Sequence, residues 1–453
     1  MSEVEQPRGS APRAPLSRPK RALVLTLGTN FAVLALTVVS GTMNARLLGP
    51  GGRGELAAIQ TIPSALASIA VLGLPSAVGY FTARNPREVR RLAVTGATIA
   101  VLSAIPFMCM GYLVMPHALR SQSASVIDRA RLYLLFTALQ AVMMMAYMGL
   151  QGLGRFGIWN VLRIAPNIAA VLAVGSAWWS GQLTAGTVAT RFLFLNVCVV
   201  PIAYAALWRS SERDAAPAPP RKRAKELLRY GLPTALMGPV GMVNLQLDQM
   251  LMAAWLPSEE LGLYAISVSW SGLLSPVLSA LGLVIFPQLA AVTDPEMRRS
   301  LVGRSLRGAV LIVICLGIGL AAATPVLLPL LFGRSFTRAV PAALILIAAG
   351  MILSVNTVLG DILRGVGAPR WPLVSQFAAL PVTVVLLVTL LPRWSLIGAG
   401  LTSLAAYLAA GIVCVMGTRR ESGLSIRAML IPTAADLSML KTTLHQMWRR
   451  KLG

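Results

Sequence analysis

Polar and charged side chains are rare inside the long apolar stretches of this chain, so each one is a candidate for a functional or structural role. An ionised group in membrane hydrocarbon costs about 3 kcal/mol or more, and it is therefore expected to face a protein interior or a wet cavity. The residues concerned are Asn44, Arg46, Glu55, Arg163, Asn167, Arg191, Asn244, Gln246, Asp248, Asp361 and Arg364.

Cations and amides of this set have the chemistry to bind an anion. Arginine pairs with phosphate or carboxylate groups through a planar fork of donors. The residues predicted to line a substrate cavity are Arg46, Asn44, Arg163, Arg191 and Gln246. Asp248 and Glu55 are the candidates for coupling transport to an ion. A second interpretation stays open, above all for Arg163, Arg191, Asp361 and Arg364: the charges snorkel to the interface or form structural ion pairs.

Residue sets for catalysis are missing from the same stretches. The two histidines, His117 and His445, fall in a predicted external loop and in the C-terminal tail. The predicted spans contain no Ser/His/Asp set, pair of catalytic carboxylates, phosphate-binding loop or metal cluster. We therefore predict a protein that is not an enzyme and has no catalytic residue, metal or cofactor, with H⁺ or Na⁺ as the possible coupling ion.

The composition places the chain in a membrane. Its 453 residues are 56% hydrophobic and 12% charged, whereas soluble proteins carry about 25% charged residues. The net charge of +24 does not require a nucleic-acid partner, because cytoplasmic loops of membrane proteins collect Lys and Arg. The partners expected from composition are membrane lipids.

About twelve apolar stretches are long enough to cross the hydrocarbon core. Their predicted ranges are 23–46, 56–82, 91–115, 131–151, 158–180, 187–208, 229–254, 262–290, 304–328, 339–360, 372–391 and 396–417. The resulting organisation is a disordered N-terminus (1–21), a first lobe (22–208), a cytoplasmic linker (209–228), a second lobe (229–417) and an amphipathic, basic tail (418–453).

Three short motifs recur in the second half, in the same order and at a nearly constant spacing, which indicates a duplicated architecture. Residues 53–57 (RGELA) correspond to 261–265 (LGLYA), 72–74 to 281–283, and 150–154 (LQGLG) to 363–367 (LRGVG). In the last pair, Gly152 and Gly154, like Gly365 and Gly367, are predicted to end a helix in a left-handed turn.

The distribution of basic residues predicts the orientation. With the N-terminus in the cytoplasm, nine of the 40 lysines and arginines fall on the outer side: Arg46, Arg53, Arg120, Arg129, Arg131, Arg191, Arg334, Arg338 and Arg393. Because basic residues concentrate in cytoplasmic loops, this asymmetry places both termini in the cytoplasm.

Several of these motifs resemble one membrane-transport family over residues 22–417. Residues 45–50 (ARLLGP) followed by 54–57 (GELA), 150–155 (LQGLGR), 247–250 (LDQM) and 261–265 (LGLYA) are similar to Wzx-type oligosaccharide flippases of the MOP superfamily. The resemblance implies an all-α polytopic membrane protein, with two pseudo-symmetric six-helix lobes around a central cavity, as in MATE and other MOP proteins.

The resemblance also implies a function. Flippases of this type move a polyprenyl-diphosphate-linked oligosaccharide from the inner to the outer leaflet of the bacterial plasma membrane by alternating access, for surface polysaccharide synthesis. The partners implied are this lipid-linked glycan and the polymerase and glycosyltransferase machinery. Two alternatives from the same superfamily are a multidrug/cation antiporter and a lipid II flippase. The lipid II group has an arginine pair shortly after Pro63, where this chain has Ala67 and Ser68. A non-transporting membrane scaffold, a third alternative, would have no cavity between its halves.

Overall fold

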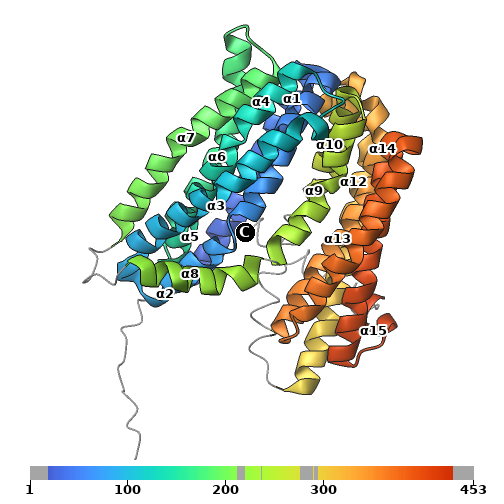
Figure 1. Cartoon of the computed structure of the whole chain (residues 1–453). Helices are drawn as coiled ribbons and strands as arrows, with labels where there is room; N and C mark the ends of the chain where they lie inside the picture. The colour runs from blue at the N-terminus through green and yellow to red at the C-terminus, as the bar shows by residue number, and fades with distance from the viewer. Residues whose placement is uncertain (1–18, 212–219, 236, 276–288, 290–293, 432–453) are drawn as a thin grey trace, which may run out of the picture.

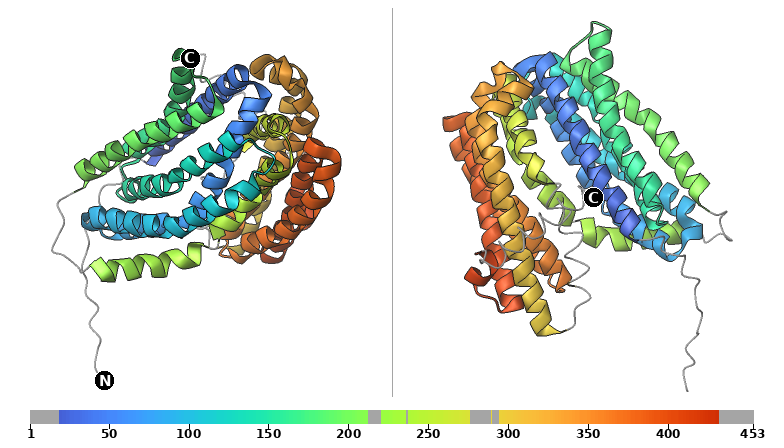
Figure 2. Two further views of the ribbon diagram at one scale, coloured as in Figure 1. Left: turned by 45° about the horizontal axis from the view of Figure 1, so that its top comes forward. Right: turned by 180° about the vertical axis from the view of Figure 1, so that it is seen from behind.

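The computed structural model describes residues 19–211, 220–235, 237–275, 289 and 294–431, and their regular structure is helical without a strand. Figure 1 shows two lobes of long helices that meet at one end, the closed end, and separate towards the other, the open end. Figure 2 shows the same separation from behind. The predicted all-α architecture of two similar lobes is confirmed.

The first lobe is built from the helices before residue 211, and α8 follows it. These are α1 (Pro19–Ala70), α2 (Leu74–Arg84), α3 (Val89–Ala118), α4 (Ala124–Tyr133), α5 (Leu135–Gly152), α6 (Phe156–Trp179), α7 (Ala185–Ser210) and α8 (Pro220–Ala235). The second lobe contains α9 (Met237–Trp255), α10 (Ser258–Ser271), α12 (Pro295–Phe332), α13 (Val340–Gly365), α14 (Arg370–Ser422) and the short α15 (Ile426–Leu430).

Eight stretches of the described residues are long and apolar enough to cross a membrane. Two of them, in α1 and α14, contain a reversal of the chain, at Gly49 (φ 69°) and at Ser395 (φ 47°). Each of these helices therefore crosses twice, so the eight stretches provide ten of the predicted crossings. The other two predicted spans, 229–254 and 262–290, correspond to α9 and α10, and most of the second beyond α10 lies outside the described residues. At the second reversal, Ser395 Oγ donates a hydrogen bond to Glu260 Oε2 at the start of α10 (2.9 Å).

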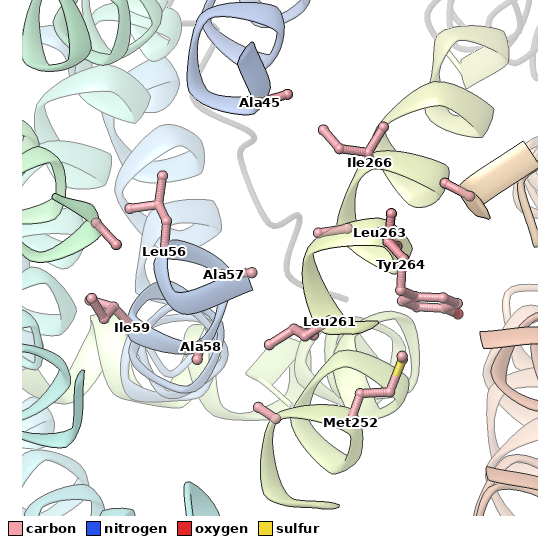
Figure 3. Packing of buried hydrophobic residues seen from close by; sticks show 14 of the residues in the cluster. Ala45, Leu56, Ala57, Ala58, Ile59, Met252, Leu261, Leu263, Tyr264 and Ile266 are labelled. Carbon is pink, nitrogen blue, oxygen red and sulfur yellow. The ribbon is translucent and has the colours of Figure 1, made fainter. Parts of the chain in front are cut away.

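The lobes touch at the closed end through α1 and α10. A Cβ atom added to Gly54 would lie 1.6 Å from the Ser258 carbonyl oxygen, and one added to Gly262 would lie 1.9 Å from the Pro50 oxygen. Only glycine allows backbones to approach this closely. Figure 3 shows Ala57 of α1 on the side that faces Leu263 of α10, and both are buried. Gly54 and Gly262 belong to the corresponding motifs of the two sequence halves.

Hydrogen bonds between the lobes surround this glycine contact. The Arg46 guanidinium donates to the carbonyl oxygens of Leu331 (2.7 Å) and Leu330 at the end of α12. Gln122 donates from the first lobe to the Ala253 oxygen (3.1 Å) at the end of α9. The last carbonyls of a helix have no partner within it, so these side chains satisfy acceptors that would otherwise need water.

The segment between the lobes differs from the prediction. From Pro220, inside the predicted linker 209–228, to Ala235 the chain forms α8, which lies across the open end of the first lobe (Figure 1). Leu227 is fully buried there, and Tyr230 stacks on Tyr80 of α2 (4.5 Å between ring centroids). Arg223 pairs with Glu226 and, at 2.6 Å, with Glu88. The hydrogen bond that Arg223 donates to Glu226, together with the charge of Glu88, raises the pKa of Arg223 above its ordinary value.

Other predicted boundaries also shift. The span predicted at 56–82 is interrupted after Ala70, because Leu72 and Gly73 adopt left-handed conformations, and α2 begins at Leu74. The span predicted from residue 131 begins at Leu135, and the short α4 precedes it. The span predicted at 229–254 begins at Met237. The predicted disordered N-terminus and the amphipathic stripe of the tail lie almost wholly outside the described residues.

The glycine contact predicts the effect of adding one methyl group. We expect Gly54→Ala to force α1 and α10 apart and to lower the stability of this conformation by about 1–3 kcal/mol, the usual cost of overpacking. The measurement is the midpoint of thermal unfolding of the purified protein in detergent. Gly51→Ala is the matched control, since a Cβ there meets nothing within 4 Å. Equal midpoints for the two variants would contradict the contact.

Candidate functional site

The described residues line four hollows that lie where the two lobes face each other or beside that interface. Hollow A (about 440 Å³) lies between α1 and α6 of the first lobe and α10 of the second. Hollow B (about 190 Å³) lies between α1, α6 and α7, and Ser269 of α10 also lines it. Hollow C (about 170 Å³) lies between α1 and α9, and hollow D (about 350 Å³) lies within the second lobe.

Neighbouring hollows share lining residues and are therefore adjacent. Thr37 and Ser269 line both A and B, Arg53 and Gln60 line both B and C, and Gln246 lines both C and D. Together the four hollows lie along the interface between the lobes, on the open-end side of the contact between α1 and α10. This is the cavity between the lobes that the sequence predicts, and a scaffold with solidly packed halves is excluded.

The charged residues that line hollows A, B and C are arginines. Arg163 of α6 lines A; its guanidinium carbon lies 4.6 Å from the centroid of the Trp159 ring, and its Nη2 donates to Asn30 Oδ1 (3.3 Å). Arg53 of α1 lines both B and C. Among the residues that the structure describes, no Asp or Glu side chain lines these three hollows, so their electrostatic character favours an anion.

Three polar atoms around hollows B and C are buried without a hydrogen-bond partner: Asn44 Oδ1, Arg53 Nε and Gln246 Oε1. Asn44 lines B, and Gln246 lines C and D. A buried polar atom left unpaired costs about 1–3 kcal/mol, so such groups are normally satisfied by protein, water or a ligand. Their gathering at one place indicates that this part of the cavity is built for a polar guest.

Hollow D holds the buried carboxylate of Asp248. Its side chain is 6% exposed. Asp248 Oδ2 accepts hydrogen bonds from the Tyr264 hydroxyl (2.5 Å) and from Ser403 Oγ (3.4 Å), and Oδ1 accepts one from the Gln249 backbone N–H (2.7 Å). Donors from α9, α10 and α14 thus converge on one carboxylate, which has no basic partner among the described residues. Asn244, one turn earlier, accepts from Thr383 and ties α9 to α14.

The structure does not bring all predicted site residues to these hollows. Arg46 instead caps the end of α12, because the carbonyls there are acceptors without a helical partner. Arg191 donates to Ser180 Oγ (2.7 Å) and Gln182 Oε1 in the connection between α6 and α7. Glu55 is half-buried on α1 and lines none of the four hollows.

The remaining predicted positions have structural surroundings. Asp361 and Arg364 pair at the end of α13 (2.5 Å). Gly154 and Gly367 adopt left-handed backbones (φ 69° and 85°), as their motifs predict. At Gly152, the last residue of α5, glycine is required for a different reason: a Cβ there would lie 2.7 Å from the Gly79 carbonyl oxygen. Gly365 ends α13 without a positive φ.

Arg53 is the cavity residue that sequence reasoning missed, since the prediction placed it in an external loop. The reversal at Gly49 is sharp, and the helix resumes at once at Pro50, so that Arg53 points back into the cavity from the first turn. One sequence signal was available. Proline is favoured at the first position of a helix, and Pro50 therefore marks the start of a new helix rather than a loop.

Groups of three or more His, Cys, Asp or Glu side chains able to hold a metal ion do not occur in the part of the chain that the structure describes. The polar groups that converge on the hollows are amides, hydroxyls, two arginines and one carboxylate. Such a set can bind and orient an anionic or hydroxyl-rich molecule by charge and hydrogen bonds.

Comparison with known proteins identifies relatives in sequence and fold. The family described as "Polysaccharide biosynthesis protein" matches residues 43–341. An uncharacterized membrane protein of Methanocaldococcus jannaschii is 24% identical over 192 residues, which are 41% of this chain and 38% of that protein. The chain thus matches well under two thirds of this curated relative's length.

Solved structures with the same fold are transporters of the MOP superfamily. An inward-facing multidrug resistance MATE family transporter has a TM-score of 0.68 at 15% identity, covering 88% of this chain and 98% of that one. Lipid II flippase MurJ, in an inward closed conformation, has a TM-score of 0.68 at 12% identity, with 93% of each chain covered. A MOP superfamily transporter from Pyrococcus furiosus, for which reverse polarity of the binding pocket suggests a different function, has a TM-score of 0.63 at 15% identity, covering 89% and 96%.

The hydrogen bonds of Asp248 predict an effect on stability. Tyr264→Phe removes the short donor and leaves the buried carboxylate under-satisfied, so we expect the free energy of unfolding to fall by about 1–3 kcal/mol. The measurement is thermal unfolding in detergent. Tyr407→Phe, in the lining of the same hollow, is the control, and its effect should be smaller. In the Asp248→Asn background the effect of Tyr264→Phe should shrink; an undiminished effect would mean that the two side chains are not coupled.

Proposed function

We propose a transport function from the premise that this chain belongs to the polysaccharide biosynthesis protein family. The proposed cargo is a polyprenyl-diphosphate-linked oligosaccharide, moved from the inner to the outer leaflet of the bacterial plasma membrane by alternating access. The solved structures that share the fold of this chain are MOP superfamily transporters, and one of them is a flippase. The chain would then act as a transporter and not as an enzyme, beside the polymerase and glycosyltransferases of surface polysaccharide synthesis.

The observation that carries this proposal is the basic lining of the interlobe cavity. Arg163 and Arg53 contribute the formal charges of hollows A, B and C, and no carboxylate in the described part of the lining neutralises them. A diphosphate is a good match for such a setting, because a charge-assisted hydrogen bond is stronger in a site of low dielectric. The polyprenyl tail would remain in the lipid, which spares it transfer through a polar cavity.

The orientation of the cavity suits the same direction of transport. The sequence prediction of a cytoplasmic basic linker supports an orientation with the closed end at the outer surface, because α8, which carries Arg223 and Lys225, lies across the open end (Figure 1). The open end would then face the cytoplasm, with both termini on that side. Loading from the inner leaflet and release after the closed end opens is the cycle that this arrangement supports.

Asp248 is the residue that we assign to ion coupling. A buried carboxylate without a basic partner can gain or lose a proton, or exchange a proton for Na⁺, as the lobes move. Hydrogen bonds from Tyr264 and Ser403 link its ionisation to the packing of α9, α10 and α14. Glu55 lacks such a setting, since it lines none of the hollows.

A multidrug/cation antiporter is the second candidate function. The carboxylate of Asp248 in hollow D favours it, since a cationic drug needs an acidic partner. The arginine-lined hollows oppose it, because they would repel such a cargo. A lipid II flippase shares the diphosphate chemistry and differs in the sugar, so the cargo assay below includes lipid II.

Removing one cavity arginine should slow translocation. In liposomes containing the purified protein and a labelled polyprenyl-diphosphate-linked oligosaccharide, we expect Arg163→Gln to lower the transfer rate by about tenfold or more, the worth of a hydrogen bond to a charged group. Arg191→Gln, outside the hollows, should leave the rate unchanged. A wild-type protein that transfers lipid II or a cationic dye but not this cargo would overturn the assignment.

Ion coupling has its own test. Asp248→Asn preserves the shape of the side chain but cannot titrate, so we expect transfer to lose its response to an imposed proton or sodium gradient while basal exchange continues. The measurement is the ratio of transfer rates with and without each gradient. If the variant responds as the wild type does, the coupling group lies elsewhere.

A further inference from the structure

We propose that Arg53, Asn44 and Gln246 form a subsite for the glycosyl-phosphate end of the cargo, with Arg53 on the phosphate and the two amides on sugar hydroxyls. This inference rests on the proposed function for the nature of the cargo. The site itself rests on the unpaired atoms of hollows B and C.

Arg53 supplies the charge of the subsite. Its guanidinium lines both hollows, and its Nε is buried without a hydrogen-bond partner. Among the described residues no carboxylate pairs with it, although ion pairs hold Arg223, Arg338, Arg364 and Arg370 elsewhere. A structural role would provide a partner, because a buried unpaired cation is costly. The missing partner is therefore an anion that the protein binds.

Two unpaired acceptors flank this cation. The buried atoms of Asn44 and Gln246 are amide oxygens, which need an N–H or O–H donor and cannot bind a fully ionised phosphate. A ligand that meets all three groups must carry an anion and hydroxyl donors close together. A phosphate attached to the first sugar has this combination, with several hydroxyl donors beside the charge, whereas a prenyl chain has neither.

The size and position of the hollows fit this end of the cargo. At about 190 and 170 Å³, hollows B and C have room for a phosphate and one sugar but not for an oligosaccharide. The larger hollow A, which shares lining residues with B, leaves space for further sugars.

The subsite also spans both lobes. Asn44 and Arg53 belong to α1, on either side of its reversal, and Gln246 belongs to α9. A ligand held by all three bridges the lobes next to the glycine contact. Binding and release of this ligand would therefore affect the packing of the two lobes at the closed end.

The test compares two short-chain probes on the full-length protein in detergent: farnesyl diphosphate, and the same lipid carrying glucose on the terminal phosphate. Dissociation constants are measured for both. The wild type should bind the sugar-bearing probe more tightly than farnesyl diphosphate. Arg53→Gln should weaken both by about 10- to 100-fold, the range for a hydrogen bond to a charged group. Arg53→Lys should recover part of this loss, because it keeps the charge.

The amide positions have a different expected signature. Asn44→Leu and Gln246→Leu should weaken the sugar-bearing probe several-fold and leave farnesyl diphosphate unchanged. Arg191→Gln is the matched control for loss of one positive charge and should change neither constant. Thermal unfolding of each empty variant checks the fold; Arg53→Gln is expected to be at least as stable as the wild type, because it removes an unpaired buried cation.

The outcomes separate the subsite from the proposed function. Unchanged binding by Arg53→Gln, or no binding by the wild type, overturns the subsite, and so does an equal effect of the amide variants on both probes. Arg53-dependent binding in a wild-type protein that translocates no lipid-linked oligosaccharide supports the subsite and refutes the flippase. Translocation that Arg53→Gln leaves intact supports the flippase and refutes the subsite.

Discussion

The contact of two backbones without side chains, Gly54 of α1 against Gly262 of α10, is the constraint on which the rest of the structure depends. Both glycines lack the Cβ atom that would strike the opposite carbonyl, so the two helices meet at the closed end. Long helices joined at one end separate towards the other, and the polar hollows lie below their meeting point. The two glycines occupy equivalent places in the duplicated motifs, so the contact joins the two repeats.

The polar bonds around that contact suit an interface that must open. Arg46, Ser121 and Gln122 donate to carbonyls at the ends of α12 and α9, and these carbonyls have no partner within their helices. When the lobes part, water can replace such donors, because the net worth of a hydrogen bond exposed to water is only about 1 kcal/mol. The closed end therefore combines close packing with polar contacts that are easily exchanged. At the other end, α8 is anchored to the first lobe by Leu227 and Tyr230.

The cavity carries an energetic cost that a bound polar ligand would relieve. Buried Asn44, Arg53 and Gln246 atoms without partners destabilise the empty protein, as is common where function and stability compete. Asp248 presents the opposite arrangement, since its carboxylate receives three hydrogen bonds inside one lobe. Polar atoms without a hydrogen-bond partner thus lie between the lobes, and the satisfied acid lies within one of them. This division fits a cargo that contacts both lobes and a coupling group that responds to the packing of one.

The sequence alone determined the membrane environment, the all-α architecture of two similar lobes and four of the residues near the cavity, Asn44, Arg163, Gln246 and Asp248. The reason is that apolar length and the cost of buried charge act locally along the chain. Helix boundaries near Leu72 and the helix α8 depended on tertiary contacts that hydropathy does not register. Which groups each arginine contacts also depended on the tertiary structure. Arg46 lies beside the unpaired carbonyls of α12, and Arg53 turns inward at the Gly49 reversal, because side-chain direction follows the path of the folded backbone.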